Sequence, residues 1–229
     1  MSNSGLLKSS IARKVAMALS AFFLMFFLLQ HLAINMTSVI SAGTFNELSH
    51  FMGTNPIIQY ALQPVLIFAV VFHFVMGFIL ELKNNAARDV RYVKYKGGAS
   101  ATWMSRNMII SGLVILAFLG LHFYDFWIPE LKIKFVDGDW SGALVEGGEP
   151  IRYYDHLVHK FVDPIRVAIY CISFVLLGLH LHHGFSSAFQ SVGAKNDKSK
   201  KGLQKLGVAY SILVPLGFIF IALFHLLNH

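Results

Sequence analysis

Apolar residues gather in five long stretches of the chain, and polar segments separate them. The stretches are residues 15–38, 58–82, 107–128, 165–188 and 206–227, to within a few residues at each end. Each can cross a hydrocarbon core about 30 Å thick as an α-helix, which needs roughly 20 apolar residues. Charged residues make up only 14% of the 229 residues, whereas soluble domains carry about 25%. The pattern predicts an all-α integral membrane protein, a single five-helix transmembrane bundle over residues 1–229.

The first stretch resembles a secretory signal peptide, because Lys8, Arg13 and Lys14 precede it. Its apolar run is longer than the roughly 7–15 residues typical of such peptides, and no A-x-A-like cleavage site follows it. We therefore expect it to remain as a membrane span. The single cysteine, Cys171, lies within the fourth stretch, which excludes a disulfide framework.

Lysine and arginine residues fall mainly on one side of the predicted bundle. With the N-terminus inside, 14 of the 19 Lys and Arg residues lie in inner segments and the other five in outer segments. Such an excess marks the cytoplasmic side, so we predict a cytoplasmic N-terminus and an external C-terminus. The first external loop is then about 39–57. The longest, about 129–163, is acidic and rich in glycine, which predicts turns.

Each of the first four stretches carries a histidine deep within the predicted membrane. These residues are His31, His73, His122 and His180. Their depth in the membrane follows from counting residues from the charged residues or the proline at each helix end, with a helical rise of about 1.5 Å per residue. His31 and His122 then lie in the outer third of the membrane, and His73 and His180 lie in its inner half. The four histidines therefore pair by depth.

Two histidines from different helices at one depth suit the axial positions of a six-coordinate haem iron. A neutral imidazole binds iron through one ring nitrogen, and the other can donate to a backbone carbonyl one turn earlier. We therefore predict an outer b haem held by His31 and His122, and an inner one held by His73 and His180. The chain has no CxxCH motif, so neither haem is attached covalently. The alternative is that these histidines form hydrogen bonds between helices or relay protons.

The residues around His73 and His180 favour the hypothesis that these histidines bind a haem. Both have a glycine at i+4, Gly77 and Gly184, on the same helix face. Such a glycine leaves room for a porphyrin, although glycine is also common at plain helix contacts. Of the three neighbouring histidines on the fourth stretch, we take His180 as the ligand. His182 points away from it, and His183 lies a turn closer to the cytoplasm, where it meets at most a haem propionate.

Four segments carry a family resemblance. They are SSIARKVAMALSAFFLMFFLLQHL, FHFVMGFILELKN, SRNMIISGLVILAFLGLHF and GLHLHHGFSSAFQSVG. In order, spacing and topology they resemble the cytochrome b subunit of succinate dehydrogenase and fumarate reductase, in its five-helix, two-haem type. The resemblance covers nearly the whole chain. The family's axial-ligand pattern falls on the two histidine pairs that the depth argument predicts.

The resemblance implies a multi-pass protein of the bacterial inner membrane that works within complex II. It implies two partners on the cytoplasmic face: a flavoprotein subunit with FAD, and an iron–sulfur subunit. Electrons from succinate would then reach a quinone through the haems, and menaquinone is the expected quinone. Lipid surrounds the chain, nucleic acid is not a partner, and a higher oligomer is left open.

Two positions bear on the direction and the site of this reaction. Fumarate-reducing members carry an acidic residue two positions before the haem histidine of the fourth helix. Gly178 stands there in this chain, so we favour succinate oxidation over a fumarate reductase. The family's quinone site near the outer haem involves a glutamate after the first helix. Glu47 is the only carboxylate in that loop, although its spacing from His31 departs from the family pattern.

The haem propionates need polar partners, and several residues at the inner interface are candidates. These are Arg13, Ser105, Arg106 and, on the fourth helix, His183. Cations pair well with carboxylates, but long basic side chains also reach the interface without any partner.

Other histidine-rich membrane proteins are weaker alternatives. A hydrogenase or formate dehydrogenase cytochrome b has a different histidine spacing, and a bc-type core needs two histidines two turns or more apart in one helix. A histidine-lined metal or proton transporter is the alternative from a different class. A transporter would be colourless when purified, whereas a cytochrome shows a reduced b-haem spectrum.

Overall fold

The computed structural model describes residues 9–86, 108–143 and 151–229. Five of its helical stretches are long and apolar enough to cross a membrane. They are Ser10–Ile40, Ile58–Lys83, Met108–Phe135, Pro164–Ser191 and Lys200–Asn228. The described part of the chain contains no strand. The predicted five-helix membrane bundle is therefore confirmed, while the orientation of its termini across the membrane stays a prediction.

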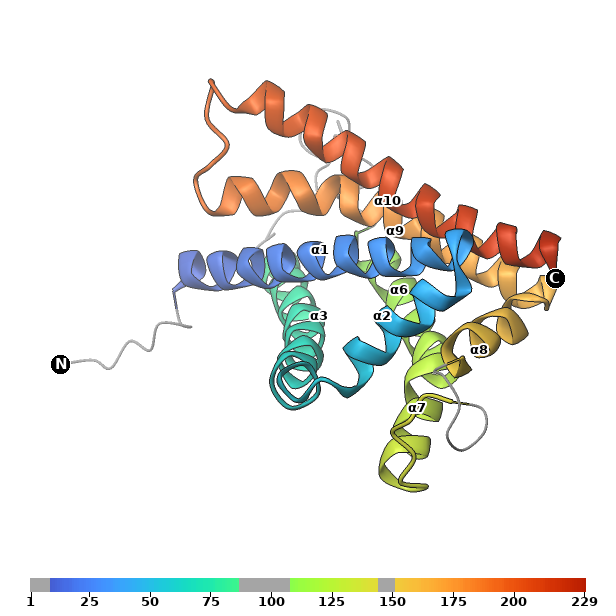
Figure 1. Ribbon diagram of the computed structural model, residues 1–229. Helices are drawn as coiled ribbons and strands as arrows, with labels where there is room; N and C mark the ends of the chain where they lie inside the picture. The colour runs from blue at the N-terminus through green and yellow to red at the C-terminus, as the bar shows by residue number, and fades with distance from the viewer. Residues whose placement is uncertain (1–8, 87–107, 144–150) are drawn as a thin grey trace.

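Two of the spans contain a π-helical segment with wider turns. The elements of the spans are α1 (Ser10–Ile40), η2 (Ile58–Leu62), α3 (Gln63–Ala86), α6 (Met108–His122), η3 (Phe123–Trp127), α7 (Ile128–Phe135), α9 (Pro164–Ser191) and α10 (Lys200–Asn228). Figure 1 shows α1, α9 and α10 running side by side. Helix α3 packs against α1, and α6 packs against α9. Helix α9 contacts α1, α6 and α10, and therefore lies at the centre of the bundle.

Capping side chains set the starts of the second and fourth spans. The Asn55 side-chain oxygen accepts hydrogen bonds from the backbone N–H groups of Ile57, at 3.0 Å, and Ile58, at 3.3 Å. Asp163 caps α9 by accepting from the N–H of Ile165, and Pro164 is the first helical residue. Proline suits this position because its missing N–H has no partner there in any case.

The outer surface of the bundle is apolar. Phe26, Phe68 and Ile172 expose 71%, 67% and 61% of their surface, and they lie on three different spans. Contiguous exposed apolar surface is unfavourable in water but suits contact with lipid. The buried core is densest between α9 and α10, where Tyr170 and Phe174 pack against residues such as Phe218.

Both segments predicted as external loops contain helices. Helix α2 (Ala42–Thr54) occupies most of 39–57, and α8 (Arg152–Phe161) with the end of α7 occupies much of 129–163. These helices are short and half polar, so a search for long apolar runs misses them. They pack against each other, and the Asn46 side chain accepts the backbone N–H of Tyr154 at 2.8 Å. The turns predicted from glycine do occur at Gly138 and Gly142, which have positive φ angles of 75° and 72°.

Candidate functional site: two pairs of buried histidines

The structure brings four histidines together as two pairs. The rings of His31 on α1 and His122 on α6 have centroids 5.8 Å apart, with their planes at 86°. The rings of His73 on α3 and His180 on α9 have centroids 6.4 Å apart, at 65°. We call these the outer pair and the inner pair, after the predicted topology. The pairing is the one the depth argument expects, and the role of the histidines as iron ligands stays a prediction.

Serine hydroxyls hold the inner pair. Ser20 Oγ lies 3.1 Å from Nδ1 of His73, and Ser111 Oγ lies 3.2 Å from Nδ1 of His180. The expectation that the second ring nitrogen bonds to a carbonyl of its own helix is therefore wrong for this pair. Each histidine instead contacts a hydroxyl on a neighbouring helix. Sequence reasoning missed both serines, although each is an isolated hydroxyl within an apolar run.

The glycines of the inner pair face methionine side chains. A methyl group added to Gly77 would lie 3.6 Å from Met17 Cε, and one added to Gly184 would lie 3.7 Å from Met108 Cε. These are ordinary van der Waals distances to the flexible ends of long side chains. The space beside each inner histidine is therefore bounded by a flexible side chain, and the room for a porphyrin stays a prediction.

Aromatic rings surround the outer pair. Phe27 stacks on His31 at 5.4 Å, and Phe118 stacks on His122 at 5.9 Å. Tyr170 lies edge-on to His122 at 6.3 Å. His122 Nδ1 is buried, and no hydrogen-bond partner for it occurs among the described residues. A buried polar atom without a partner is costly, and in the described part of the chain no protein group offsets that cost for His122.

The remaining histidines of α9 face elsewhere. His182 lies 3.3 Å from Ser211 Oγ on α10, on the side away from the inner pair. His183 is half-buried one turn beyond His180. Gly178 packs tightly on α10, because a methyl group there would lie 2.9 Å from the Ser211 carbonyl oxygen. Pro215 has no N–H to bond this carbonyl, and an acidic side chain at 178 would have no room.

Of the polar residues expected near the propionates and the quinone, Arg13, Glu47 and His183 lie within the described residues. Arg13 lies in the first turn of α1, and Glu47 lies on the exposed face of α2. Ser105 and Arg106 lie outside the described residues. The roles expected for these residues stay predictions.

The geometry of the pairs fits a bis-histidine haem. A metal–imidazole bond is about 2.0 Å long, so two imidazoles on one metal atom have centroids about 6 Å apart. The observed separations of 5.8 and 6.4 Å agree with this value. The described residues contain no cluster of three or more His, Cys, Asp or Glu side chains that could hold a metal ion. A haem does not need one, because its porphyrin supplies the other four ligands.

A buried carboxylate lies next to the outer pair, and sequence reasoning missed it. Asp125 in η3 is fully buried. Its carboxylate forms an ion pair with Arg166 and accepts a hydrogen bond of 2.7 Å from the Tyr170 hydroxyl. Its backbone oxygen lies 2.6 Å from Nε2 of His156. The signal in the sequence is an aspartate three residues after His122, at the end of an apolar run.

Further charges tie α7 and α8 together. We call Glu130, Lys134, Asp139, Arg152 and Tyr153 the outer cap. Glu130 pairs with Lys134 at 3.1 Å and with Arg152 at 3.0 Å, and Arg152 pairs with Asp139 at 2.7 Å. Arg152 also lies over the Tyr153 ring. Burial, with the nearby Glu130 carboxylate, raises the pKa of Tyr153 to about 12.

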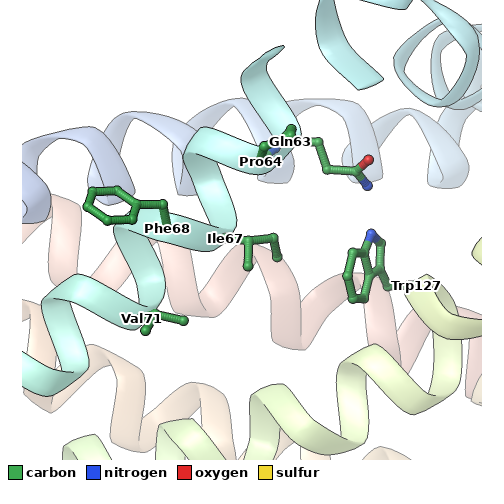
Figure 2. Close-up of a pocket in the computed structure, with 6 residues that line it drawn as sticks. All are labelled: Gln63, Pro64, Ile67, Phe68, Val71 and Trp127. Carbon is green, nitrogen blue, oxygen red and sulfur yellow. The ribbon is translucent and has the colours of Figure 1, made fainter. Parts of the chain in front are cut away.

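An apolar cleft of about 490 Å³ opens between α3 and η3. The residues that line it are Gln63, Pro64, Ile67, Phe68, Val71 and Trp127. Figure 2 shows the Gln63 amide and the indole nitrogen of Trp127 pointing toward each other at one side of the cleft. The indole Nε1 is buried and has no hydrogen-bond partner in the described part of the chain. Gln63 directly follows η2 and Trp127 ends η3, and π-helical turns often occur at functional sites.

Comparison with known proteins gives one informative relative. The chain is 28% identical over 131 residues to the succinate dehydrogenase cytochrome b558 subunit of Bacillus subtilis (strain 168). The match covers 56% of this chain and only about 60% of the length of that relative. No family model and no solved structure matches the chain. The relative confirms the resemblance to succinate dehydrogenase cytochrome b subunits that the helix motifs predict, over 56% of the chain; that it covers nearly the whole chain stays a prediction.

Proposed function

We propose that this chain is the membrane anchor of a succinate:quinone oxidoreductase, which carries electrons from an iron–sulfur partner through two b haems to a quinone. The observation that carries the proposal is the presence of two histidine pairs, each spaced for one iron atom. The similarity to a succinate dehydrogenase cytochrome b558 subunit supports it. Within such a complex, succinate loses two electrons and two protons to become fumarate, and the quinone takes up two of each.

The chain's own task is to hold and insulate its cofactors. His31 and His122 would hold the outer haem, and His73 and His180 the inner one. A haem iron bound by two imidazoles supplies reversible one-electron transfer without binding substrate. The aromatic rings around the outer pair keep water away. On α1, His31 of the outer pair lies 11 residues beyond Ser20, which contacts His73 of the inner pair. The outer and inner pairs are therefore about 16 Å apart along the helix.

The partners and the location follow from the same proposal. A flavoprotein subunit with FAD and an iron–sulfur subunit would dock on the cytoplasmic face, where the predicted inner loops are basic. The bacterial inner membrane is the expected location. At this face Arg13, Ser105, Arg106 and His183 are the proposed partners of the inner haem propionates.

The cleft between α3 and η3 is the place we propose for the quinone ring. It opens between exposed apolar residues such as Phe68 and Val71, so an isoprenoid quinone can enter from the lipid. Trp127 Nε1 has no hydrogen-bond partner among the described residues, so it can donate to a quinone carbonyl. A chain of ring contacts joins Trp127 to the outer pair, through Phe123 at 5.2 Å and from there to His122 at 6.4 Å.

Glu47 stays the proposed proton donor on the quinone side. It is an exposed carboxylate on α2, which contacts η2 at the edge of the cleft. Quinone reduction consumes protons, so its site needs a donor or a route to water. Glu47 and Trp127 can be tested separately, because one would supply a proton and the other a hydrogen bond. Menaquinone is the quinone we propose.

Two alternatives are less well supported. A fumarate reductase with a carboxylate two residues before the fourth-helix ligand is disfavoured by the tight packing of Gly178. A metal transporter is disfavoured because each candidate site has two histidines and no third ligand within the described residues.

The deciding experiment is haem quantitation on the purified full-length chain. A pyridine haemochrome assay should give two non-covalent b haems per chain. One haem or none would contradict the proposal, and a colourless preparation that transports metal would replace it.

A further inference from the structure

Helices α1 and α6 carry the same set of side chains at the same spacing. Met17, Ser20 and His31 on α1 correspond to Met108, Ser111 and His122 on α6, with identical intervals of three and 11 residues. Eleven residues make about three helical turns, so the serine and the histidine of each set lie on one helix face. Each of these helices therefore offers a serine to the inner pair and a histidine to the outer pair.

The two serines make the same pair of contacts. Ser20 Oγ donates to the carbonyl oxygen of Met17 at 2.8 Å, and Ser111 Oγ donates to that of Met108 at 2.9 Å. A serine hydroxyl has a single proton, and helical serines commonly give it to such a carbonyl. The hydroxyl oxygen is then left to accept a bond from the histidine, and His180 also forms a hydrogen bond with the Met108 backbone. Nδ1 of His73 and of His180 is therefore the protonated nitrogen, which leaves the lone pair on Nε2.

We propose that Ser20 and Ser111 are positioning residues for the inner haem ligands. Each fixes one imidazole in the tautomer that presents Nε2 to iron, and each fixes the rotation of the ring. This inference rests on the proposed function, because it assumes that the inner pair binds haem. Outer-shell partners of this kind orient a metal-binding histidine and raise its basicity as a ligand.

The serines also predict a difference between the two haems. A hydrogen bond from Nδ1–H to Ser20 or Ser111 makes the imidazole a stronger donor, which favours ferric over ferrous iron. The described residues give His122 Nδ1 no such partner. The inner haem should therefore have its midpoint potential lowered by the serines, and the outer haem should not respond to them.

The test is redox titration of the full chain, in its complex, with single and double alanine variants. Ser20→Ala and Ser111→Ala should raise the midpoint potential of one haem and leave the other unchanged. The double variant should raise it further. The EPR signal of that ferric haem, which depends on the angle between the two imidazole planes, should shift as well. Ser20→Thr and Ser111→Thr keep the hydroxyl and should restore both signals.

Ser38→Ala is the matched control. Ser38 also lies on α1, donates to a carbonyl three residues earlier at 2.7 Å, and contacts a histidine, His225, at 3.0 Å. His225 is not a proposed ligand. Ser38→Ala should therefore leave the midpoint potentials of both haems unchanged.

The outcomes separate this inference from the proposed function. If the unmodified chain lacks haem, the proposed function fails. If both haems are present in the alanine variants with unchanged potentials and EPR signals, the inference alone is wrong. Loss of both haems in an alanine variant would also contradict it, because the serines contact only the inner pair. Equal shifts of both haems, or a shift in Ser38→Ala, would contradict it too.

Discussion

At the inner pair each imidazole has a serine hydroxyl within 3.2 Å of Nδ1, whereas at the outer pair His122 Nδ1 has no partner among the described residues. The outer rings are instead enclosed by phenylalanine and tyrosine. Hydrogen bonds set the direction of a ring, while aromatic packing excludes water and tolerates small rotations. Each inner imidazole is therefore held by a serine on a neighbouring helix. In the outer pair His31 has a longer polar contact within its own helix, with Asn35 Nδ2 at 3.4 Å from Nδ1, and aromatic packing encloses both rings.

The two ends also differ in charge. Near the outer pair, Asp125 is buried with Arg166 and Tyr170, and the outer cap adds further ion pairs. Removing one member of a buried ion pair is more costly than removing a surface pair. The outer pair should thus depend on the buried ion pair beside it and on the outer cap, which hold its helices together. The inner pair should depend on its immediate neighbours.

The largest effect should come from a ligand of the inner pair. His180→Ala removes one of two axial ligands, so the inner haem should be lost while the outer haem stays. A halved haem content with one remaining midpoint potential would be the result. His183→Ala is the control on the same helix and should keep both haems. Loss of haem in His183→Ala together with retention in His180→Ala would reverse the ligand assignment.

Asp125→Asn tests how far the outer pair depends on its buried charge. The change leaves Arg166 without its main partner. A fully buried pair broken in this way loses about 3–5 kcal/mol. Arg166 is a quarter exposed and lies 3.9 Å from Asp163, so we expect about 2 kcal/mol. Thermal unfolding in detergent measures this loss, and the outer haem should be released before the inner one.

Asp155→Asn is the matched control, because Asp155 is an exposed carboxylate on the neighbouring helix α8. It should leave both stability and haem release unchanged. An Asp125→Asn protein that loses the inner haem first would contradict the link between this charge and the outer pair.

The sequence predicts the helices and the pairing well because both depend on simple periodicity. A span is about 20 apolar residues, and depth follows from counting residues from its ends. Short helices such as α2 and α8 escape this reasoning, because their stability comes from packing against each other and not from a continuous apolar run. The Asn46 contact to Tyr154, 108 residues away, has no local signal.

The partners of the histidines were harder to predict for a related reason. Ser20 and Ser111 lie in the first half of their helices, and they contact histidines 53 and 69 residues away. Only the packing of α1 on α3 and of α6 on α9 brings them together. The repeated interval of 11 residues to His31 and His122 is visible in the sequence, and it becomes meaningful once the helix faces are known.

A smaller effect is expected at the cleft beside the outer pair. Trp127→Phe keeps the ring but removes one donor. A neutral hydrogen bond contributes about 1 kcal/mol, so the KM for quinone should rise about fivefold. Haem content and dye-coupled succinate oxidation should not change. Trp140→Phe, away from the cleft, is the control.

Glu47→Gln tests whether Glu47 supplies a proton to the quinone at the same site. A proton donor acts on the rate, so this variant should lower kcat for quinone and leave KM unchanged. Unchanged quinone kinetics in both Trp127→Phe and Glu47→Gln would move the quinone site away from the outer pair, and the inner face near Arg13 would be tested next.

The smallest effect concerns the outer cap and pH. Burial and the Glu130 carboxylate raise the pKa of Tyr153 from its ordinary value of 10.0 to about 12. The folded protein therefore prefers the neutral phenol. This contribution to stability is complete below pH 10 and is lost as the pH rises through 12, because only the unfolded chain ionises freely in between. The melting temperature of the unmodified protein should thus fall faster from pH 10 to 12 than that of Tyr153→Phe, and parallel curves would show that the outer cap does not hold this phenol neutral.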